Sequence, residues 1–163
     1  MEESIKDPDM TRAESSGEEP GENGLSLEES ISRAFDIREK DWSQYSPLTL
    51  AYIGDCVYDL VVRTVLVKRA NRPTDMLHRE TAGVVRAVAQ SEAARRLMEA
   101  FTPQEQAIYR RGKNAKPHTT AKHATRKEYL QATGLEAVLG YLYLDGQYER
   151  VVQLVKMAAG DSL

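Results

Sequence analysis

Two acidic residues interrupt the most apolar stretches of the chain. Asp55 lies within residues 48–67, which are rich in Leu, Val and Ile, and Glu136 lies within residues 135–144. Both stretches have the composition of core helices, where an unpaired carboxylate is rare because its desolvation is costly. One explanation is a salt bridge from each acid to a neighbouring helix. The other is a divalent cation, since Mg²⁺ prefers carboxylate oxygens and often shares them with substrate phosphate.

The residues around these acids support a site that a ligand can approach closely. Gly54 precedes Asp55 and Gly134 lies two residues before Glu136, so that a backbone, a metal ion or a phosphate group could come near. Asp59 follows Asp55 by one helical turn and is expected on the same face, as a supporting acid or as a partner for a helix dipole. Cys56, the only cysteine, excludes an intrachain disulfide and is expected to be a small buried filler.

A basic segment follows in the second half of the chain. Residues 110–127 contain seven Lys and Arg residues and no acid: Arg110, Arg111, Lys113, Lys116, Lys122, Arg126 and Lys127. This local charge density suits a polyanion such as nucleic acid, although such a segment can also be a solvated face. Beside a magnesium site, a basic segment indicates phosphodiester hydrolysis, with the metal activating water and neutralising charge on the leaving oxygen.

The elements that must position these residues are all predicted to be helices. Ser46-Pro47 is a favourable helix start, and the apolar stretch after it predicts a mostly buried helix to about residue 69. Three further helices are predicted to begin at threonine caps. The helix after Thr74 is expected to break near Ser91, the helix after Thr102 covers 104–111, and a third begins after Thr125. The helix after Thr125 is predicted to reach residue 144, and a last helix carries residues 148–155. Residues 112–124 are predicted to form a basic loop.

The two ends of the chain differ in charge. Residues 1–41 hold 13 acids and 5 bases, whereas residues 42–163 hold 12 acids and 17 bases. We predict an acidic N-terminal extension over 1–41, with residues 1–24 disordered and a short helix within 26–40, and one folded all-α domain over 42–163. No apolar stretch is long enough to cross a bilayer and no signal peptide is recognisable, so a soluble cytoplasmic protein is expected.

The segments around the two acids resemble those of a known enzyme family. Residues 51–59 (Ala-Tyr-Ile-Gly-Asp-Cys-Val-Tyr-Asp) resemble the signature helix of the ribonuclease III family. Residues 133–146 are similar to the family's second acidic helix, whose Glu binds the catalytic metal. The resemblance covers about residues 42–158. We expect that the family's double-stranded-RNA-binding domain does not follow, and residues 111–116 (Arg-Gly-Lys-Asn-Ala-Lys) lead the basic segment, so the chain resembles the short bacterial branch called mini-ribonuclease III.

Two positions depart from the longer members of the family. Ala51 stands where the signature helix has a Glu, and Thr133 stands where the second helix has an Asp. Only Asp55 and Glu136 remain as catalytic and metal-binding acids, and the resemblance implies that the short branch manages with these two. Metal binding is then expected to depend more on water and RNA oxygens, and to be weaker.

The resemblance implies an Mg²⁺-dependent endonuclease of double-stranded RNA that matures precursor 23S ribosomal RNA. It also implies a homodimer, in which two sites cut opposite strands and leave staggered ends. The residues expected to bind RNA are Arg111, Lys113, Asn114, Lys116 and Lys122. Two alternatives remain: a ribonuclease III-like protein that binds RNA without cutting it, and a different all-α metal phosphohydrolase acting on nucleotides.

Overall fold

The fold is built from α-helices, as predicted. The structure is a computed structural model that describes residues 24–38, 40–116 and 123–163, and this part of the chain contains helices and no strand. Its α-helices are α1 (Leu27–Ala34), α2 (Pro47–Arg69), α3 (Thr74–Val85), α4 (Ala87–Leu97), α5 (Pro103–Lys113), α6 (Arg126–Leu144) and α7 (Tyr148–Ala159), with short 3-10 turns at Trp42–Gln44 and Gly160–Ser162.

The chain divides into two compact units between Ile37 and Arg38. In the first unit, α1 begins with a capping box made by Ser26 and Glu29, and its apolar residues Leu27, Ile31 and Phe35 are exposed. This helix is shorter than the predicted 26–40. The predicted disorder of residues 1–24 lies almost entirely outside the described residues, and the division into a tail and a domain stays a prediction.

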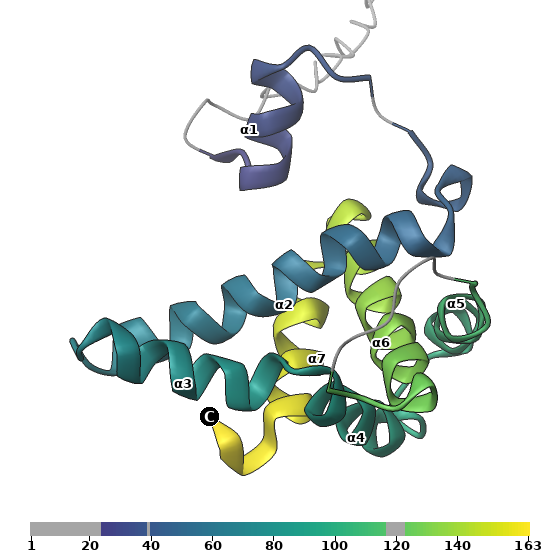
Figure 1. The fold of residues 1–163 in the computed structure, drawn as a ribbon. Coiled ribbons are helices and arrows are strands. Elements are labelled where there is room, and N and C mark those ends of the chain that lie inside the picture. The colour runs from purple at the N-terminus through teal and green to yellow at the C-terminus, as the bar shows by residue number, and fades with distance from the viewer. Residues whose placement is uncertain (1–23, 39, 117–122) are drawn as a thin grey trace, which may run out of the picture. The chain divides into compact units, whose positions relative to one another are not determined.

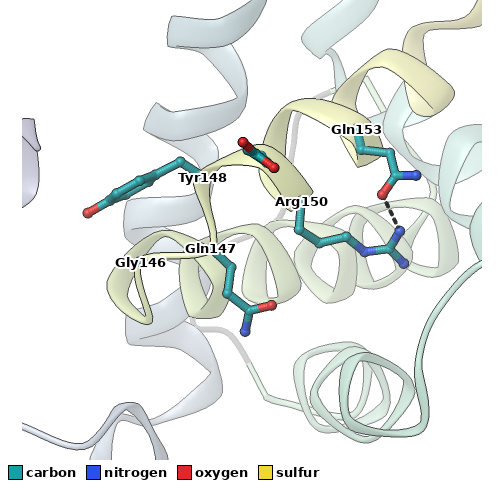
Figure 2. Close-up of a pocket in the computed structure, with 6 residues that line it drawn as sticks. Gly146, Gln147, Tyr148, Arg150 and Gln153 are labelled. Atoms are coloured by element: carbon teal, nitrogen blue, oxygen red, sulfur yellow. Dashed lines mark hydrogen bonds between the residues drawn. The ribbon is translucent and has the colours of Figure 1, made fainter.

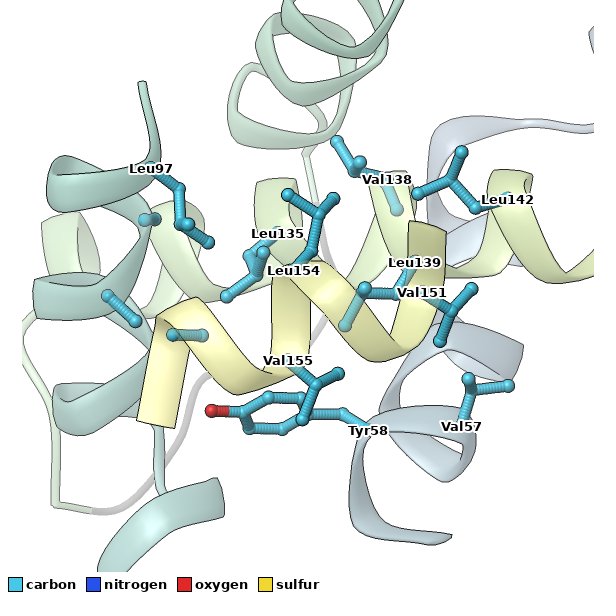
Figure 3. Close-up of a cluster of buried hydrophobic side chains, with 14 of the residues drawn as sticks. Val57, Tyr58, Leu97, Leu135, Val138, Leu139, Leu142, Val151, Leu154 and Val155 are labelled. Atoms are coloured by element: carbon cyan, nitrogen blue, oxygen red, sulfur yellow. The ribbon is translucent and has the colours of Figure 1, made fainter. Parts of the chain in front are cut away.

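Helix α6 is the centre of the second unit. It contacts α2, α4, α5 and α7, which lie around it (Figure 1). Most of its side chains are buried. Leu135, Val138, Leu139 and Leu142 form the middle of the core with side chains of α7, α2 and α4 (Figure 3). A helix surrounded in this way is apolar on nearly every face, which explains the apolar composition of residues 135–144 apart from Glu136.

The helix starts follow the predicted caps with one exception. The hydroxyls of Ser46, Thr102 and Thr125 each accept a hydrogen bond from a backbone amide in the first turn of α2, α5 and α6. Thr74 was expected to cap α3, but it is the first helical residue and Pro73 occupies the cap position without a side-chain hydrogen bond. The break expected near Ser91 occurs instead at Arg86, whose backbone is extended between α3 and α4.

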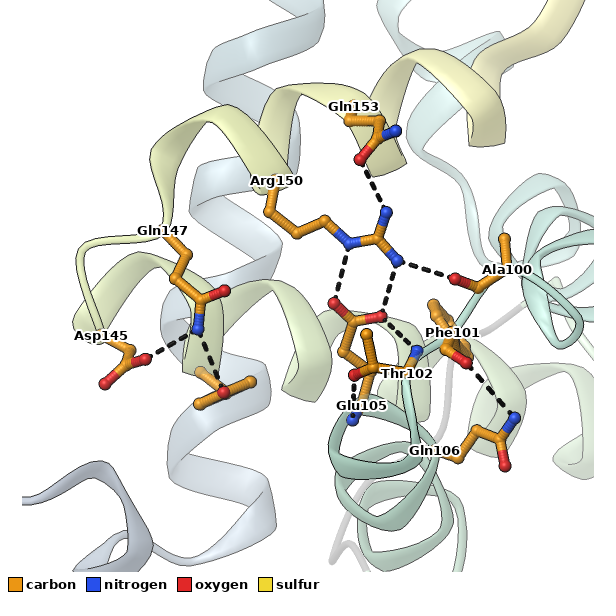
Figure 4. A network of polar contacts seen from close by, with 10 residues as sticks. Ala100, Phe101, Thr102, Glu105, Gln106, Asp145, Gln147, Arg150 and Gln153 are labelled. Carbon is orange, nitrogen blue, oxygen red and sulfur yellow. Dashed lines mark hydrogen bonds and ion pairs between the residues drawn. The ribbon is translucent and has the colours of Figure 1, made fainter.

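Helices α5 and α7 are joined by a buried ion pair that the sequence reading did not include. Glu105 is 2% exposed and accepts two hydrogen bonds of 2.8 Å from the Arg150 guanidinium, which also donates to the backbone oxygen of Ala100 at 2.7 Å (Figure 4). The same Glu105 carboxylate completes the capping box with Thr102. Because both partners are hydrogen-bonded on several sides, this pair anchors the start of α5 against α7.

Helices α2 and α6 approach each other most closely at two glycines. A Cβ atom on Gly54 would lie 1.7 Å from the backbone oxygen of Glu136, and one on Gly140 would lie 1.9 Å from the backbone oxygen of Leu50. No side chain fits at either position, because the obstructing atoms belong to the backbone of the facing helix. The crossing therefore sets the place of Asp55 and Glu136, which lie next to it.

We expect Gly54→Ala to lower the free energy of unfolding by about 2 to 4 kcal/mol, because the added methyl forces the two backbones apart. Gly83 provides the matched control: it is also within a helix, but nothing lies within 4 Å of its Cβ position. Gly83→Ala should raise stability by up to about 1 kcal/mol through helix propensity. Urea unfolding measures both changes, and equal effects of the two substitutions would contradict the close crossing.

Candidate active site

Asp55 and Glu136 come together where α2 crosses α6. Asp55 follows Gly54 on α2, and Glu136 is the residue whose backbone oxygen contacts Gly54. Glu136 is half-buried, but Asp55 is exposed, so the prediction of two buried acids is wrong for Asp55. The reason is that α2 covers only one side of the core and its other face lies open, with Tyr52 79% and Leu60 53% exposed.

Both acids of the pair have a raised pKa, as expected where nearby positive charge does not balance two carboxylates. Burial raises the pKa of Glu136 to about 8, with a further contribution from the negative charge of Asp55, while a hydrogen bond from Gln90 lowers it. Although Asp55 is exposed, the surrounding protein partly desolvates its carboxyl, and this, followed by the charge of Asp59, also raises the pKa of Asp55. Within the described residues no Lys, Arg or His forms an ion pair with either acid, so the salt-bridge alternative finds no support there.

The neighbours of Asp55 on α2 have different roles from those expected. Asp59 pairs with Arg63 at 2.5 Å, one turn further along the helix. Cys56 is exposed, and the prediction that it is a buried filler is wrong because its position falls on the open face of α2. Asp59 thus influences Asp55 through its charge, whereas Cys56 belongs to the outer surface.

The two positions without acids are part of the core. Ala51 is 5% exposed, and Thr133 is 4% exposed and donates its hydroxyl hydrogen to the backbone oxygen of Tyr129 at 3.0 Å. Across the described ranges no group of three or more His, Cys, Asp or Glu side chains could hold a metal ion. Two carboxylates without a cationic partner still fit Mg²⁺, which keeps several waters and needs few protein oxygens.

The basic residues lie partly on a helix rather than in a loop. Helix α5 extends through Lys113, so Arg111 and Lys113 occupy its last turn, Asn114 is its cap, and Lys116 is exposed just beyond. The loop predicted from residue 112 therefore begins later, and Lys122 falls outside the described residues. Cations at a helix C-terminus also stabilise the helix dipole, which is the structural alternative to a role in binding.

The end of α5 is close to the turn of α6 that carries Glu136. A Cβ atom on Gly112 would lie 2.9 Å from the Cα atom of Gly134 and 2.9 Å from the Cβ atom of Ala137. Gly134, in turn, packs against Tyr109 of α5 and not against a ligand. These small residues let α5 lie directly on α6, which brings the basic last turn of α5 beside the same segment of α6 that meets α2.

Gln90 on α4 is a neighbour of Glu136 that sequence reasoning did not single out. It is 1% exposed, and its interaction with the Glu136 carboxyl lowers the pKa of that group. The only sequence signal was a glutamine directly after the apolar residues Val88 and Ala89.

An open pocket lies elsewhere, at the turn between α6 and α7. Its lining residues include Gln147, Tyr148 and Arg150 (Figure 2), and neither Asp55 nor Glu136 is among them. Its arginine is already engaged by Glu105. This pocket is therefore separate from the acid pair.

The helical architecture around α6 defines a ribonuclease III domain. Residues 48–147 match the family model described as the ribonuclease III domain, a span that includes α2 to α6. The chain belongs to the ribonuclease III family.

Its relatives place it in the mini-ribonuclease III branch, and it is an endoribonuclease of that branch. It is 45% identical to the mini-ribonuclease 3 of Thermoanaerobacter sp. (strain X514) over 69% of this chain and 80% of that protein. It is 47% identical to the mini-ribonuclease 3 of Symbiobacterium thermophilum over 69% of this chain and 87% of that protein.

A solved structure supports the fold independently. The crystal structure of a protein from Fusobacterium nucleatum aligns with a TM-score of 0.69 and 28% identity, over 76% of this chain and 99% of that one. Among the described helices, none combines the length and apolar composition needed to span a membrane. The predicted all-α, ribonuclease III-like fold is confirmed.

Proposed function

We propose that this endoribonuclease cleaves double-stranded RNA by Mg²⁺-dependent hydrolysis, with Asp55 and Glu136 as its catalytic metal ligands. The observation that carries the proposal is the meeting, at the crossing of α2 and α6, of two acids that form no ion pair with any Lys, Arg or His that the structure describes. A bound Mg²⁺ would activate a water and neutralise charge on the scissile phosphate. The protein's part is to hold two carboxylate oxygens rigidly, because neither helix can shift at Gly54.

Duplex RNA suits the surface next to this pair. A-form RNA exposes 2′-hydroxyls and phosphates across a wide, shallow minor groove, so that a protein can recognise its shape without reading bases. Arg111, Lys113 and Lys116 lie at the end of α5, beside the segment of α6 that holds Glu136. We propose that they, with Asn114 and Lys122, hold the phosphate backbone while the acid pair acts on one strand.

Replacing both Lys113 and Lys116 with glutamine should weaken duplex binding. It should also reduce the magnitude of the slope of log affinity against log salt concentration by about 1 to 2. Fluorescence anisotropy with labelled duplex between about 50 and 200 mM salt measures both quantities. Lys68→Gln with Lys156→Gln removes the same charge from exposed sites on α2 and α7 and serves as the control. If both pairs have the same effect, the end of α5 is only a solvated surface.

A homodimer would give the enzyme a second active site for the opposite strand. The open face of α2 carries a stripe of apolar and small residues, with Tyr52, Leu60 and Val67 between 53% and 79% exposed and Cys56 among them. This stripe runs along the same helix as Asp55. We propose that it packs against a second copy of the chain, because pairing there would cover the apolar side chains and set two acid pairs on one assembly.

Leu60→Asp should convert the dimer to a monomer, because it introduces a charge that pairing would have to desolvate. Light scattering after size-exclusion chromatography measures the mass. Val152→Asp is the matched control, since Val152 is also 53% exposed but lies on α7. A dimer that survives Leu60→Asp would refute an interface on this face of α2.

We further propose that the natural substrate is the duplexed end of precursor 23S ribosomal RNA, as membership of the mini-ribonuclease III branch suggests. The test compares cleavage of a generic duplex with cleavage of precursor RNA, with Mg²⁺ and with a chelator. Membership of an endoribonuclease family favours cleavage over the two alternatives, binding without cutting and hydrolysis of nucleotides. Intact RNA at every Mg²⁺ concentration, with binding retained, would support the binding-only alternative.

A further inference from the structure

The side chain of Gln90 has a buried oxygen atom with no hydrogen-bond partner among the described residues. Gln90 is 1% exposed on α4, and its Nε2 donates a hydrogen bond of 2.8 Å to the backbone oxygen of Val85. Its Oε1 is buried and accepts no hydrogen bond from the part of the chain that the structure describes. Leaving a buried carboxamide oxygen unpaired costs free energy, so buried polar atoms in native proteins nearly always have a partner.

The other buried atoms without partners have a simpler explanation. They are Nε of Arg72 and one oxygen of Glu80, which belong to a single ion pair whose two side chains are 28% and 35% exposed. Solvent can reach those groups through small movements. Gln90 is 1% exposed, so bulk solvent does not reach its free oxygen in the same way, and the neighbouring groups of Gln90 must account for it.

The acid pair is among these neighbours. Gln90 lies close enough to the Glu136 carboxyl to lower its pKa, which favours the ionised form of that group. Nε2 carries two hydrogens, one of which is donated to Val85. The second is available to Glu136, which leaves Oε1 as the unused atom of a carboxamide at the edge of the site.

We propose that Gln90 is a positioning residue of the active site: its Nε2 orients the Glu136 carboxylate, and its Oε1 accepts a hydrogen bond from the hydration shell of the divalent cation. The inference rests on the proposed cation site of Asp55 and Glu136. It also accounts for a site with only two acids, because Gln90 adds a neutral oxygen where Ala51 and Thr133 supply none. Such supporting partners strengthen the binding of hydrated ions.

A purely structural role explains only half of the geometry. The hydrogen bond to Val85 connects the start of α4 to the end of α3, so any substitution of Gln90 that removes this bond should lower the stability of the fold. That bond uses one hydrogen of Nε2 and leaves Oε1 unexplained. The two roles therefore separate in an experiment that measures cation binding apart from stability.

The experiment measures Mn²⁺ binding, without RNA, from the electron paramagnetic resonance signal of the free ion. Gln90→Met keeps the length of the side chain but removes both hydrogen-bonding groups, and we expect Mn²⁺ to bind about tenfold more weakly. Ser91→Ala is the matched control, since it removes another buried hydrogen bond of α4, from Ser91 to Gln131, away from the acids. It should lower the melting temperature but leave Mn²⁺ affinity unchanged. Equal affinities of Gln90→Met and wild type would overturn the inference.

Two further variants make the result decisive. Gln90→Glu keeps an oxygen acceptor but loses the Nε2 donor, so we expect it to bind Mn²⁺ more tightly than Gln90→Met and no more tightly than wild type. A folded Gln90→Glu protein that binds no Mn²⁺ overturns the inference even if Gln90→Met fails to fold. Asp55→Asn tests the proposed function itself, because it should lose Mn²⁺ binding whatever Gln90 does. Wild-type affinity in Asp55→Asn would refute the acid pair as the cation site, whereas its loss combined with wild-type affinity in Gln90→Met would refute only the role of Gln90.

Discussion

Asp55→Asn is expected to reduce the rate of duplex RNA cleavage by about a thousandfold or more. The substitution keeps the shape of the side chain and removes one of the two charges that hold the cation, and a loss of several kcal/mol of transition-state stabilisation corresponds to this factor. Glu136→Gln should have an equal effect. Because Asp55 is exposed and Glu136→Gln replaces a half-buried carboxyl by a neutral group of the same shape, neither variant should lose its fold.

Single-turnover cleavage of a labelled duplex measures this loss, with circular dichroism to check the fold. Asp59→Asn is the matched control: it is the same substitution one turn along α2, at a residue that forms an ion pair with Arg63. It should change the rate only a few-fold. A near-normal rate for Asp55→Asn, or a thousandfold loss for Asp59→Asn, would place the cation site elsewhere on α2.

The stability of the metal-free protein is expected to fall as the pH rises from about 4.5 to about 8. Glu136 has an ordinary pKa of 4.5 when unfolded and about 8 when folded, so between these values the folded chain binds more protons than the unfolded chain. The contribution is fully present below the lower value and is lost as pH rises through the upper one. Glu136→Gln should remove this dependence and stabilise the protein at high pH by about 2 to 4 kcal/mol.

Urea unfolding in the presence of a chelator, at several pH values, measures the effect. Asp55→Asn should move the fall in stability to lower pH without abolishing it, because the charge of Asp55 is the second cause of the raised pKa of Glu136. Added Mg²⁺ should stabilise wild type most at high pH, where Glu136 is already ionised and no proton must leave. The same pH dependence in Glu136→Gln and wild type would contradict a raised pKa at this carboxyl.

Much of the fold could be predicted because its signals are local. The caps of α2, α5 and α6 depend on a hydroxyl and a backbone amide three residues away, and a proline in the first turn suits only a helix start. The two apolar helices were recognisable from composition, and their acids stood out against it. Where the local signal was ambiguous, as at Thr74, the predicted cap was wrong.

The sequence by itself determined which side chains can do chemistry; the tertiary structure decided how they are arranged. Composition could not indicate that one face of α2 is open, so Asp55 was expected to be buried and is exposed. Gly54 looked like an approach for a ligand, but it is where the backbone of α6 rests on α2. Gln90 joins Glu136 only because α4 packs on α6. Burial and contact between distant segments depend on how helices pack, which no short stretch of sequence encodes.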